Sequence, residues 1–416
     1  MAIVLSLGTG VTLAADYDSP EAKARQAAKH WAYQPVQSPS APQVKQAAWV
    51  RTPVDAFILA KLEEQNLKPS ADADRATFIR RATLDVTGVI PTPEEVKDFV
   101  SDKSPNAYEK LVDRLLASPR YGERQGRRWL DLARYSDSTG FQGDQTRRNN
   151  FRYRDYVINA FNQDKPYDRF LKEQLAGDEL WPNEQDALVA TGFLAGYPDN
   201  LNSRDLVQRK YQIETDMTDT VGQALLAQTL SCARCHNHKF DKISQKDYFS
   251  FQAFFANTAF NEKIPAAKGE QEAAYEEADA KWQAATKTIR ARQKEILEPL
   301  REKAVKYHKE RYLDDSRESI FKAEAQWTPL DRWVNWRLAN VSTDRDVANY
   351  LRLTAEGKDF PDYNPENIPK WEEYKKLDAD LKKYDNLRPS GSKFVTAATE
   401  PGPAGAAHLH PLLGHP

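Results

Sequence analysis

Cysteine and methionine are scarce in this sequence of 416 residues, which holds two of each. Cys232 and Cys235 cannot staple a chain of this length, so a disulfide-rich scaffold is excluded and the pair must have a local task. No internal run approaches the roughly 18 apolar residues of a membrane-spanning helix, so we expect no integral membrane span. The formal net charge of −2 gives no bulk electrostatic reason to expect nucleic acid as a partner.

Alternating runs of β-branched residues are also rare, whereas apolar spacing and capping signals predict helices along most of the chain. Residues 92–95 (Thr-Pro-Glu-Glu) place a cap residue, a proline at the first helical position and a carboxylate at the third. The sequence therefore predicts a mainly α fold: a multi-helix domain with a C-x-x-C-H segment, followed by a long charged helix or helical hairpin. We expect helices near 121–136, 150–163, 167–176 and 204–230, and another after Ser244 that buries Tyr248, Phe251, Phe254 and Phe255.

Composition divides the chain into segments of different character. Residues 1–15 are apolar and small up to Ala15, which predicts a signal peptide and export to the periplasm or otherwise out of the cytoplasm. The other expected segments are an extended proline-rich arm at 30–53, a helical domain at 54–262, a charged long helix or hairpin at 266–314, a small helical segment at 315–387, and a disordered or truncated tail without helix or strand at 388–416.

Both cysteines stand in the segment Cys232-Ala233-Arg234-Cys235-His236. Haem c is held by two thioether bonds from cysteines to the porphyrin vinyl groups, and a gap of two residues spans the separation of those groups. The next residue, a histidine, then falls beneath the iron as the proximal ligand. The spacing predicts covalent haem c, anchored by Cys232 and Cys235 and ligated by His236.

Other interpretations of the same residues stay open. A C-x-x-C pair can be a thiol–disulfide redox site, although no thioredoxin-like α/β unit is visible around it. A structural disulfide is the simplest alternative for an exported protein. Zinc could be held by Cys232, Cys235, His236 and His238, although ligands packed into seven residues would make a cramped tetrahedron.

The sixth ligand of a haem decides its chemistry, and the sequence leaves it open. Met217 is a candidate because it lies on the helix that leads into the motif, although a core-filling role suits it equally. His238 is too near His236 in sequence to reach the opposite face of the same ring. We expect His238 to orient a neighbour, bond a propionate or bind a second ion.

Asp131, Arg134 and Tyr135 stand at helical i, i+3 and i+4 spacing, with Asp137 just beyond them. That spacing predicts a buried ion-pair network, or alternatively a polar site at a haem edge or substrate cleft where these residues would be candidates for catalysis.

Arg152 and Arg154 belong to a basic cluster with Arg147 and Arg148. Arginine suits bidentate contact with haem propionates or an acidic sugar, whereas a solvated helix face would be the structural alternative. No Ser-His-Asp or G-x-S-x-G arrangement and no phosphate-binding glycine loop is present, so hydrolase and kinase functions have no support.

Several longer phrases resemble the cytochrome-associated domain of unknown function that is abundant in planctomycetes and related bacteria. The resemblance runs from His30 to Asn257. Its matching phrases are residues 30–35 (HWAYQP), 80–88 (RRATLDVTG), 121–124 (YGER), 129–137 (WLDLARYSD), 174–178 (QLAGD) and 232–241 (CARCHNHKFD). The resemblance implies export, a C-x-x-C-H segment and partnership with a C-terminal domain that is mostly missing here. It also implies a role in extracellular polysaccharide use, with polysaccharide as a further partner.

From these observations we expect an exported c-type haem protein that takes part in periplasmic electron transfer with a redox partner protein. The first alternative is a haem-dependent periplasmic oxidoreductase acting on a carbohydrate or peroxide, with one open face of the haem. The second is a binding or structural module without haem, in which zinc or a disulfide closes the motif.

Overall fold

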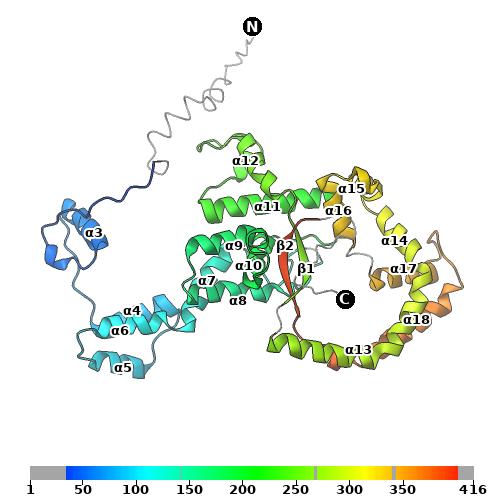
Figure 1. Ribbon diagram of the computed structural model, residues 1–416, viewed down its shortest axis with the longest axis horizontal. Coiled ribbons are helices and arrows are strands. Elements are labelled where there is room, and N and C mark those ends of the chain that lie inside the picture. The colour runs from blue at the N-terminus through cyan, green and yellow to red at the C-terminus, as the bar shows by residue number, and fades with distance from the viewer. Residues whose placement is uncertain (1–33, 142, 267–268, 340–342, 402–416) are drawn as a thin grey trace, which may run out of the picture. The chain divides into compact units, whose positions relative to one another are not determined.

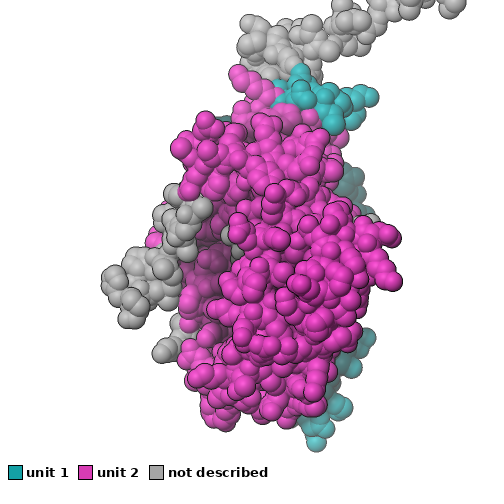
Figure 2. All heavy atoms as spheres, turned by 90° about the vertical axis from the view of Figure 1, so that its right-hand side faces the viewer, with its two compact units in different colours: residues 1–115, 235–245 teal, residues 116–234, 246–416 magenta. Residues whose placement is uncertain are grey.

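The computed structural model of the protein describes residues 34–141, 143–266, 269–339 and 343–401. Over these residues the chain is mainly helical, which confirms the predicted fold class (Figure 1). The signal peptide predicted at 1–15 lies outside the described residues. Within the described part of the chain, no helix is both long and apolar enough to cross a bilayer. The chain divides into two compact units, which Figure 2 colours separately.

The first unit holds the described residues 34–115 and 235–245. Polar residues immediately before its helices satisfy the free backbone N–H groups there. The cap predicted at Thr92 is confirmed, because Glu95 N donates to Thr92 Oγ1 at 3.2 Å and Thr92 N donates to the Glu95 carboxylate at 2.8 Å. The elements of residues 34–115 are η2 (Ala47–Trp49), α3 (Pro53–Glu64), α4 (Arg75–Thr87), α5 (Pro93–Ser101) and α6 (Ala107–Leu116), at whose last residue the second unit begins.

Helices α4, α5 and α6 bury one apolar cluster, which includes Ile79, Phe99 and Leu111. Arg75, the first residue of α4, lies with its guanidinium 4.4 Å from the centre of the Phe99 ring. The same guanidinium donates to the Phe99 carbonyl oxygen at 2.7 Å. A cation over an aromatic face and a satisfied carbonyl both stabilise the end of α5 against α4.

The second unit, residues 116–234 and 246–416, begins with helices that pack closely. Gly122 lets α7 approach α8, because a Cβ there would lie 2.3 Å from the Ile158 carbonyl oxygen, and Gly122 N donates to Asn162 Oδ1 at 2.8 Å. The elements of this part are α7 (Pro119–Leu132), α8 (Asn150–Asn162), α9 (Tyr167–Leu180), α10 (Gln185–Ala190), η3 (Thr191–Gly196), α11 (Leu206–Leu226), η4 (Ser231–Arg234), α12 (Gln245–Gln252) and η5 (Ala253–Phe255).

Gln174, fully buried on α9, joins three elements through its side chain. Its Oε1 accepts from Trp129 Nε1 and from the Tyr153 hydroxyl, both at 2.7 Å. The helix is kinked just beyond, at Ala176 (φ −151°, ψ 35°). A Cβ at the next residue, Gly177, would lie 2.0 Å from the Ala187 carbonyl oxygen. The phrase Gln174–Asp178 therefore has a structural task, which is to bring α9 against α7, α8 and α10.

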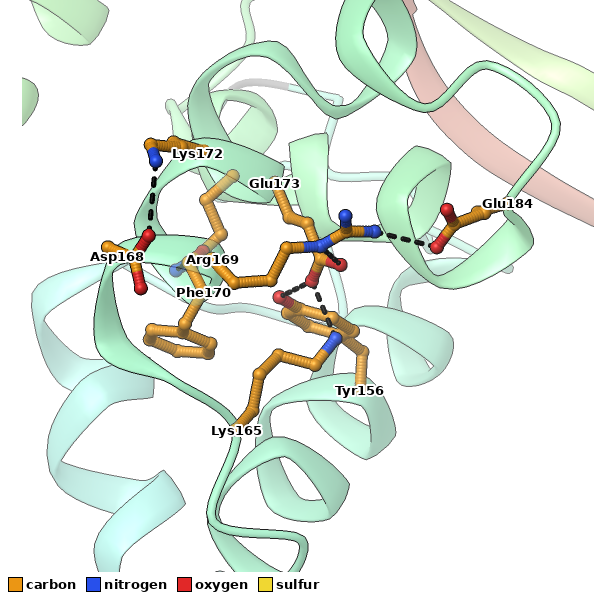
Figure 3. A network of polar contacts seen from close by, with 9 residues as sticks. Tyr156, Lys165, Asp168, Arg169, Phe170, Lys172, Glu173 and Glu184 are labelled. Carbon is orange, nitrogen blue, oxygen red and sulfur yellow. Dashed lines mark hydrogen bonds and ion pairs between the residues drawn. The ribbon is translucent and has the colours of Figure 1, made fainter.

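Glu173 is the other buried polar side chain at this place, and Figure 3 shows its partners. Its carboxylate accepts from Tyr156 Oη, Lys165 Nζ and Arg169 Nε, each at 2.6 Å. Burial alone would raise the pKa of Glu173, but these three donors hold it below its ordinary value of 4.5. The carboxylate is thus charged, paired and fully engaged in the scaffold.

Two strands form the sheet of the described residues, β1 (Ala259–Pro265) and β2 (Phe394–Thr399), which pair antiparallel. The Asn149 side chain donates to the Glu262 carbonyl at 2.9 Å and to Thr396 Oγ1 at 3.2 Å, so both strands are attached to the start of α8. The expectation that 388–416 contains no helix or strand is therefore wrong for β2. That strand is stabilised by a partner far away in the sequence, which local composition does not reveal.

The chain between β1 and β2 is helical again and has a cluster of its own, which includes Leu297, Tyr350 and Leu351. The charged stretch predicted as a long helix or hairpin at 266–314 contains two helices separated by the 3-10 turn that includes Pro299. The elements are α13 (Glu270–Leu297), η6 (Glu298–Leu300), α14 (Arg301–Glu310), α15 (Asp314–Phe321), η7 (Glu324–Gln326), α16 (Pro329–Ala339), α17 (Asp344–Glu356), α18 (Asn367–Lys382) and η8 (Asp385–Leu387).

Candidate functional site

Helix α11 leads into the C-x-x-C-H segment and ends in a left-handed residue, Ala227 (φ 52°). After this reversal, Leu230 and Ala233 are buried, and Cys232 between them is exposed. Ala233 N donates to the Leu230 carbonyl at 2.8 Å, which closes the short turn η4. The apolar residues of the turn therefore hold it against the second unit, while the Cys232 thiol faces solvent.

Cys235 and the ten residues after it belong to the first unit, where hydrogen bonds shape their loop. His238 N donates to the Ile243 carbonyl at 2.8 Å, and Gln245 N donates to Asn237 Oδ1 at 2.9 Å. Asp241 N donates to His238 Nδ1 at 2.9 Å, and the His238 ring is buried. These bonds join His238 to the backbone of its own loop, and the roles predicted for His238 stay predictions.

His238 also has the Asp241 carboxylate 3.2 Å from its Nδ1. One ring nitrogen cannot accept from the Asp241 N–H and donate to the carboxylate at once. The backbone bond is the shorter of the two, so we assign Nδ1 as the acceptor and place the proton on Nε2. In that form the ring is neutral and its Nδ1 lone pair is not available to a metal.

The His236 ring is exposed, in contrast to that of His238. Its Nδ1 lies 2.7 Å from the Asn237 carbonyl oxygen. A carbonyl oxygen only accepts hydrogen bonds, so Nδ1 carries the proton and donates it. In the neutral ring this leaves the Nε2 lone pair free and directed away from that bond. Such a bond fixes the tautomer and raises the basicity of the coordinating nitrogen in metal-ligating histidines.

Both cysteines are free and exposed, so neither thiol is engaged in a disulfide. Among the described residues, no group of three or more His, Cys, Asp or Glu side chains converges as metal ligands. Cys232, Cys235 and His236 thus present two thiols and one imidazole nitrogen to solvent. That donor set fits the haem predicted from the spacing, because attachment requires both thiols and one imidazole Nε2.

Met217, the methionine considered as a sixth ligand, is fully buried on α11 in the main apolar cluster of the second unit. On the same helix Asp219 accepts a 3.1 Å hydrogen bond from Tyr248 Oη. Burial raises the pKa of Asp219, although the Tyr248 hydroxyl and the charge of Arg234 oppose that rise. Because Arg234 lies between the two cysteines in sequence, Asp219 and Tyr248 are polar residues near the motif that sequence reasoning missed.

Arg134 does not continue the helix as its spacing with Asp131 and Tyr135 predicted. Helix α7 ends at Leu132, and Arg134 has a left-handed backbone with φ 58°. Its Nη2 donates to Asp216 Oδ1 on α11 at 2.6 Å. The predicted network that joins Asp131 to Arg134 is therefore wrong, because the left-handed turn directs Arg134 to a partner 82 residues away.

The remaining atoms of that guanidinium are unusual. Arg134 Nε and Nη1 are buried and form no hydrogen bond with the described residues. Burial raises the pKa of Asp216 above its ordinary value, and the charge and hydrogen bond of Arg134 oppose this rise without cancelling it. Tyr135 Oη donates instead to Asp137 Oδ1 at 2.6 Å, and the pKa of Tyr135 is raised by burial and by this bond. Arg134 and Tyr135 are thus each bonded to a carboxylate of the fold, and a catalytic role for them stays a prediction.

The arginine cluster predicted to meet propionates is largely used within the fold. Arg152 is 12% exposed and donates to Glu272 at 2.7 Å and to the Phe394 carbonyl at 3.0 Å, and so it fastens α13 and β2 to α8. Arg154 pairs with its neighbour Asp155 at 2.8 Å. A role of Arg152 or Arg154 in cofactor binding stays a prediction. Their observed contacts are structural. Arg147 likewise donates to the carbonyls of Ala195 and Tyr197, and Arg148 is exposed.

One of the four aromatic residues predicted to be buried after Ser244, Phe254, is exposed. Tyr248 and Phe255 are buried as expected, and Phe251 is half-buried. Phe254, however, is 81% exposed. Helix α12 ends at Gln252 and a 3-10 turn follows, so the helical spacing used for the prediction no longer holds at Phe254.

Comparison with known proteins finds one family. A family model described as PSCyt2, a protein of unknown function (DUF1549), matches residues 53–260, which is half of the chain and includes the C-x-x-C-H segment. No curated protein and no solved structure matches the chain.

Proposed function

The chain belongs to the PSCyt2 family of proteins of unknown function (DUF1549), and from this premise we propose that it is an exported c-type haem protein that transfers electrons. The observation that carries the proposal is the exposed motif itself. Two free thiols and a histidine whose Nδ1 donates to the Asn237 carbonyl stand at C-x-x-C-H spacing. We further propose a redox protein as partner, outside the cytoplasm.

The residues of the motif have separate tasks in this proposal. Cys232 and Cys235 would hold the porphyrin through two thioether bonds, each made by adding one S–H across one vinyl group. His236 would hold the iron through Nε2, and its bond to Asn237 keeps the ring in the tautomer that has this nitrogen free. A bound haem would supply one-electron chemistry at its iron.

The surroundings of the motif prepare these residues before any cofactor binds. Leu230 and Ala233 anchor the turn that carries Cys232, and the buried His238 ring braces the loop that follows His236. Because His238 Nδ1 accepts from Asp241 N, we assign His238 to positioning rather than to iron ligation. Met217 is part of the apolar core, and its burial supports a packing role for it.

The test is production of the full chain in a host that exports it together with haem-attachment enzymes, followed by a pyridine haemochrome assay. We expect c-type bands, one haem per chain and a mass increase that survives denaturation. Cys232→Ala and Cys235→Ala in one chain should abolish covalent attachment. His308→Gln, which alters a histidine on α14, is the matched control and should keep full haem content.

Each negative outcome points to a different alternative. If the c-type bands are absent and one equivalent of zinc is found, the motif is a zinc site and not a haem site. A mass lower by two hydrogens would indicate a disulfide between Cys232 and Cys235. If haem is attached, ready binding of cyanide would indicate an oxidoreductase with an open coordination position at the iron, and not an electron carrier. A carrier should be six-coordinate and bind cyanide poorly.

A further inference from the structure

A cavity in the second unit lies among α11, β1 and α16 and shares no lining residue with the C-x-x-C-H segment. It is a small cavity, and part of it is open to solvent. Ile213, Phe260, Trp333 and Trp336 provide its apolar lining. We propose that this cavity binds a small carboxylate with a short apolar tail, and that Arg337 is the residue that holds the carboxylate.

The buried charges of the cavity already satisfy each other. Arg209 Nε and Nη2 donate to the two oxygens of Asp199 at 2.7 and 2.6 Å, in a fork-to-fork geometry. The two side chains are only 4% and 10% exposed. A bidentate pair of this kind is strong and specific, so the charges of Arg209 and Asp199 offset each other within the cavity.

Arg337 differs from Arg209 in having donors to spare. It lines the same cavity at 24% exposure, and its Nη2 is 3.5 Å from Asp199, at the outer limit for a hydrogen bond. No other ion pair or side-chain hydrogen bond of Arg337 occurs among the described residues. Its planar guanidinium therefore faces the cavity region with N–H groups that an acceptor can occupy.

Tyr197 adds a second donor to the lining. Burial raises the pKa of its hydroxyl, so the phenol keeps its proton at neutral pH and can donate. Glu262 also lines the cavity, but its side chain is exposed and its charge is screened by water. The available groups are thus donors beside an apolar wall, and they select a ligand with acceptor oxygens at one end.

A carboxylate suits this arrangement better than a single-atom anion. It is planar and accepts two parallel N–H bonds from one guanidinium, which a lysine cannot offer. The indole rings of Trp333 and Trp336 provide apolar area for a short tail. The cavity is small, so we infer a ligand of few carbon atoms.

The experiment titrates sodium butyrate into the full chain by calorimetry, with butyramide as the uncharged analogue of the same shape. We expect saturable binding of butyrate and at least about tenfold weaker binding of butyramide, because the amide loses the charge-assisted pair. Equal affinities, or no binding of butyrate, would overturn the proposal. Inorganic phosphate that binds as tightly as butyrate would also overturn it, since the apolar tail would then contribute nothing.

Variants locate the site. Arg337→Met should weaken butyrate binding at least about tenfold, whereas Arg332→Met, on the same helix but outside the cavity lining, should leave the affinity unchanged. Unfolding midpoints of both variants are measured alongside. If Arg337→Met fails to fold, the comparison of butyrate with butyramide in the unaltered chain still decides the proposal. Equal losses in the two variants would contradict the assignment to Arg337.

Discussion

Glu173 and Arg134 are charged side chains in the interior of the second unit, and they differ in how many hydrogen-bond partners they have. Glu173 is 2% exposed and accepts three hydrogen bonds from Tyr156, Lys165 and Arg169, as Figure 3 shows. Arg134 has one partner, Asp216, and leaves two buried nitrogens without a hydrogen bond among the described residues. Its backbone also adopts the left-handed conformation, with φ 58°.

The difference shows how scaffold and candidate site can be told apart in this chain. A buried charge whose partners are complete stabilises packing and has no capacity left for a ligand. A buried charge with missing partners costs stability, and its retention in a strained backbone needs another reason. Arg209 and Arg337 differ in a related way, because Arg209 is buried in a bidentate pair with Asp199, whereas Arg337 is 24% exposed and lies 3.5 Å from the same carboxylate.

The largest loss of stability should come from a change at Glu173, whose buried carboxylate has a full set of hydrogen-bond donors. Glu173→Gln keeps the shape of the side chain but leaves Lys165 and Arg169 without their shared negative charge. We expect a loss of about 3 kcal/mol in the free energy of unfolding at pH 7, measured by urea denaturation. The pKa of Glu173 is lowered in the folded state, so its contribution is present above the ordinary value of 4.5 and fades as the pH falls through the folded pKa.

Glu184→Gln is the matched control, because Glu184 also pairs with Arg169, at 2.6 Å, but is 55% exposed. An exposed pair contributes little, so the control should lose less than about 1 kcal/mol. Equal losses in Glu173→Gln and Glu184→Gln would show that burial and completeness of partners do not govern the effect.

Arg134→Met should cost less, about 1 to 2 kcal/mol at pH 7, because the change also removes two donors that have no partner among the described residues. Asp216 would lose its cation, and its pKa, already raised by burial, would rise further. An acid with a raised folded pKa binds its proton more tightly when folded, so the deficit should shrink as the pH falls from 8 to 5. Urea denaturation at several pH values measures this.

The double variant Arg134→Met with Asp216→Asn sharpens the test. Without the carboxylate, the deficit should be smaller than in Arg134→Met alone and should no longer depend on pH in this range. A pH-independent deficit in the single variant, or one as large as in Glu173→Gln, would contradict the view that Arg134 is incompletely satisfied.

Local features of the fold could be predicted from the sequence because their causes are local. The cap at Thr92 involves residues three positions apart, and the helices predicted at 150–163 and 167–176 match α8 and α9 closely. The C-x-x-C-H segment is likewise a local signal, and its exposure agrees with a role at the surface. Its cofactor stays a proposal.

What the sequence could not provide are the partners that folding brings from far away. Asp216 lies 82 residues from Arg134, and no spacing rule joins them. Strand β2 pairs with β1 although all of α13 to α18 lies between the two strands in the sequence. The composition around β2 is that of a linker and does not reveal this distant partner. The cavity around Arg337 also combines residues that precede this long insertion with residues of α16, which lies within it. The periodicity of apolar residues describes one helix or strand at a time and does not reveal contacts between elements that are distant in the sequence.

Asp178 offers a third case, a partly buried acid that takes part in no ion pair among the described residues. Burial raises its pKa from 3.8 to about 6, and the charges of Glu179 and Glu400 add to the rise. Because the folded state binds this proton more tightly, stability falls as the pH rises from about 4 to about 6, and the cost is complete above that range.

Asp178→Asn removes this cost and should therefore stabilise the protein by about 1 kcal/mol at pH 7 to 8, a figure reduced for the partial exposure of the group. The gain should disappear below about pH 4, where Asp178 is protonated in both states. Asp168→Asn, on the same helix and exposed beside Lys172, is the control and should change stability little at any pH. Thermal unfolding across pH 4 to 8 measures both. A gain that persists at pH 4 would mean that packing, and not the missing partner of a buried charge, sets the stability at this position.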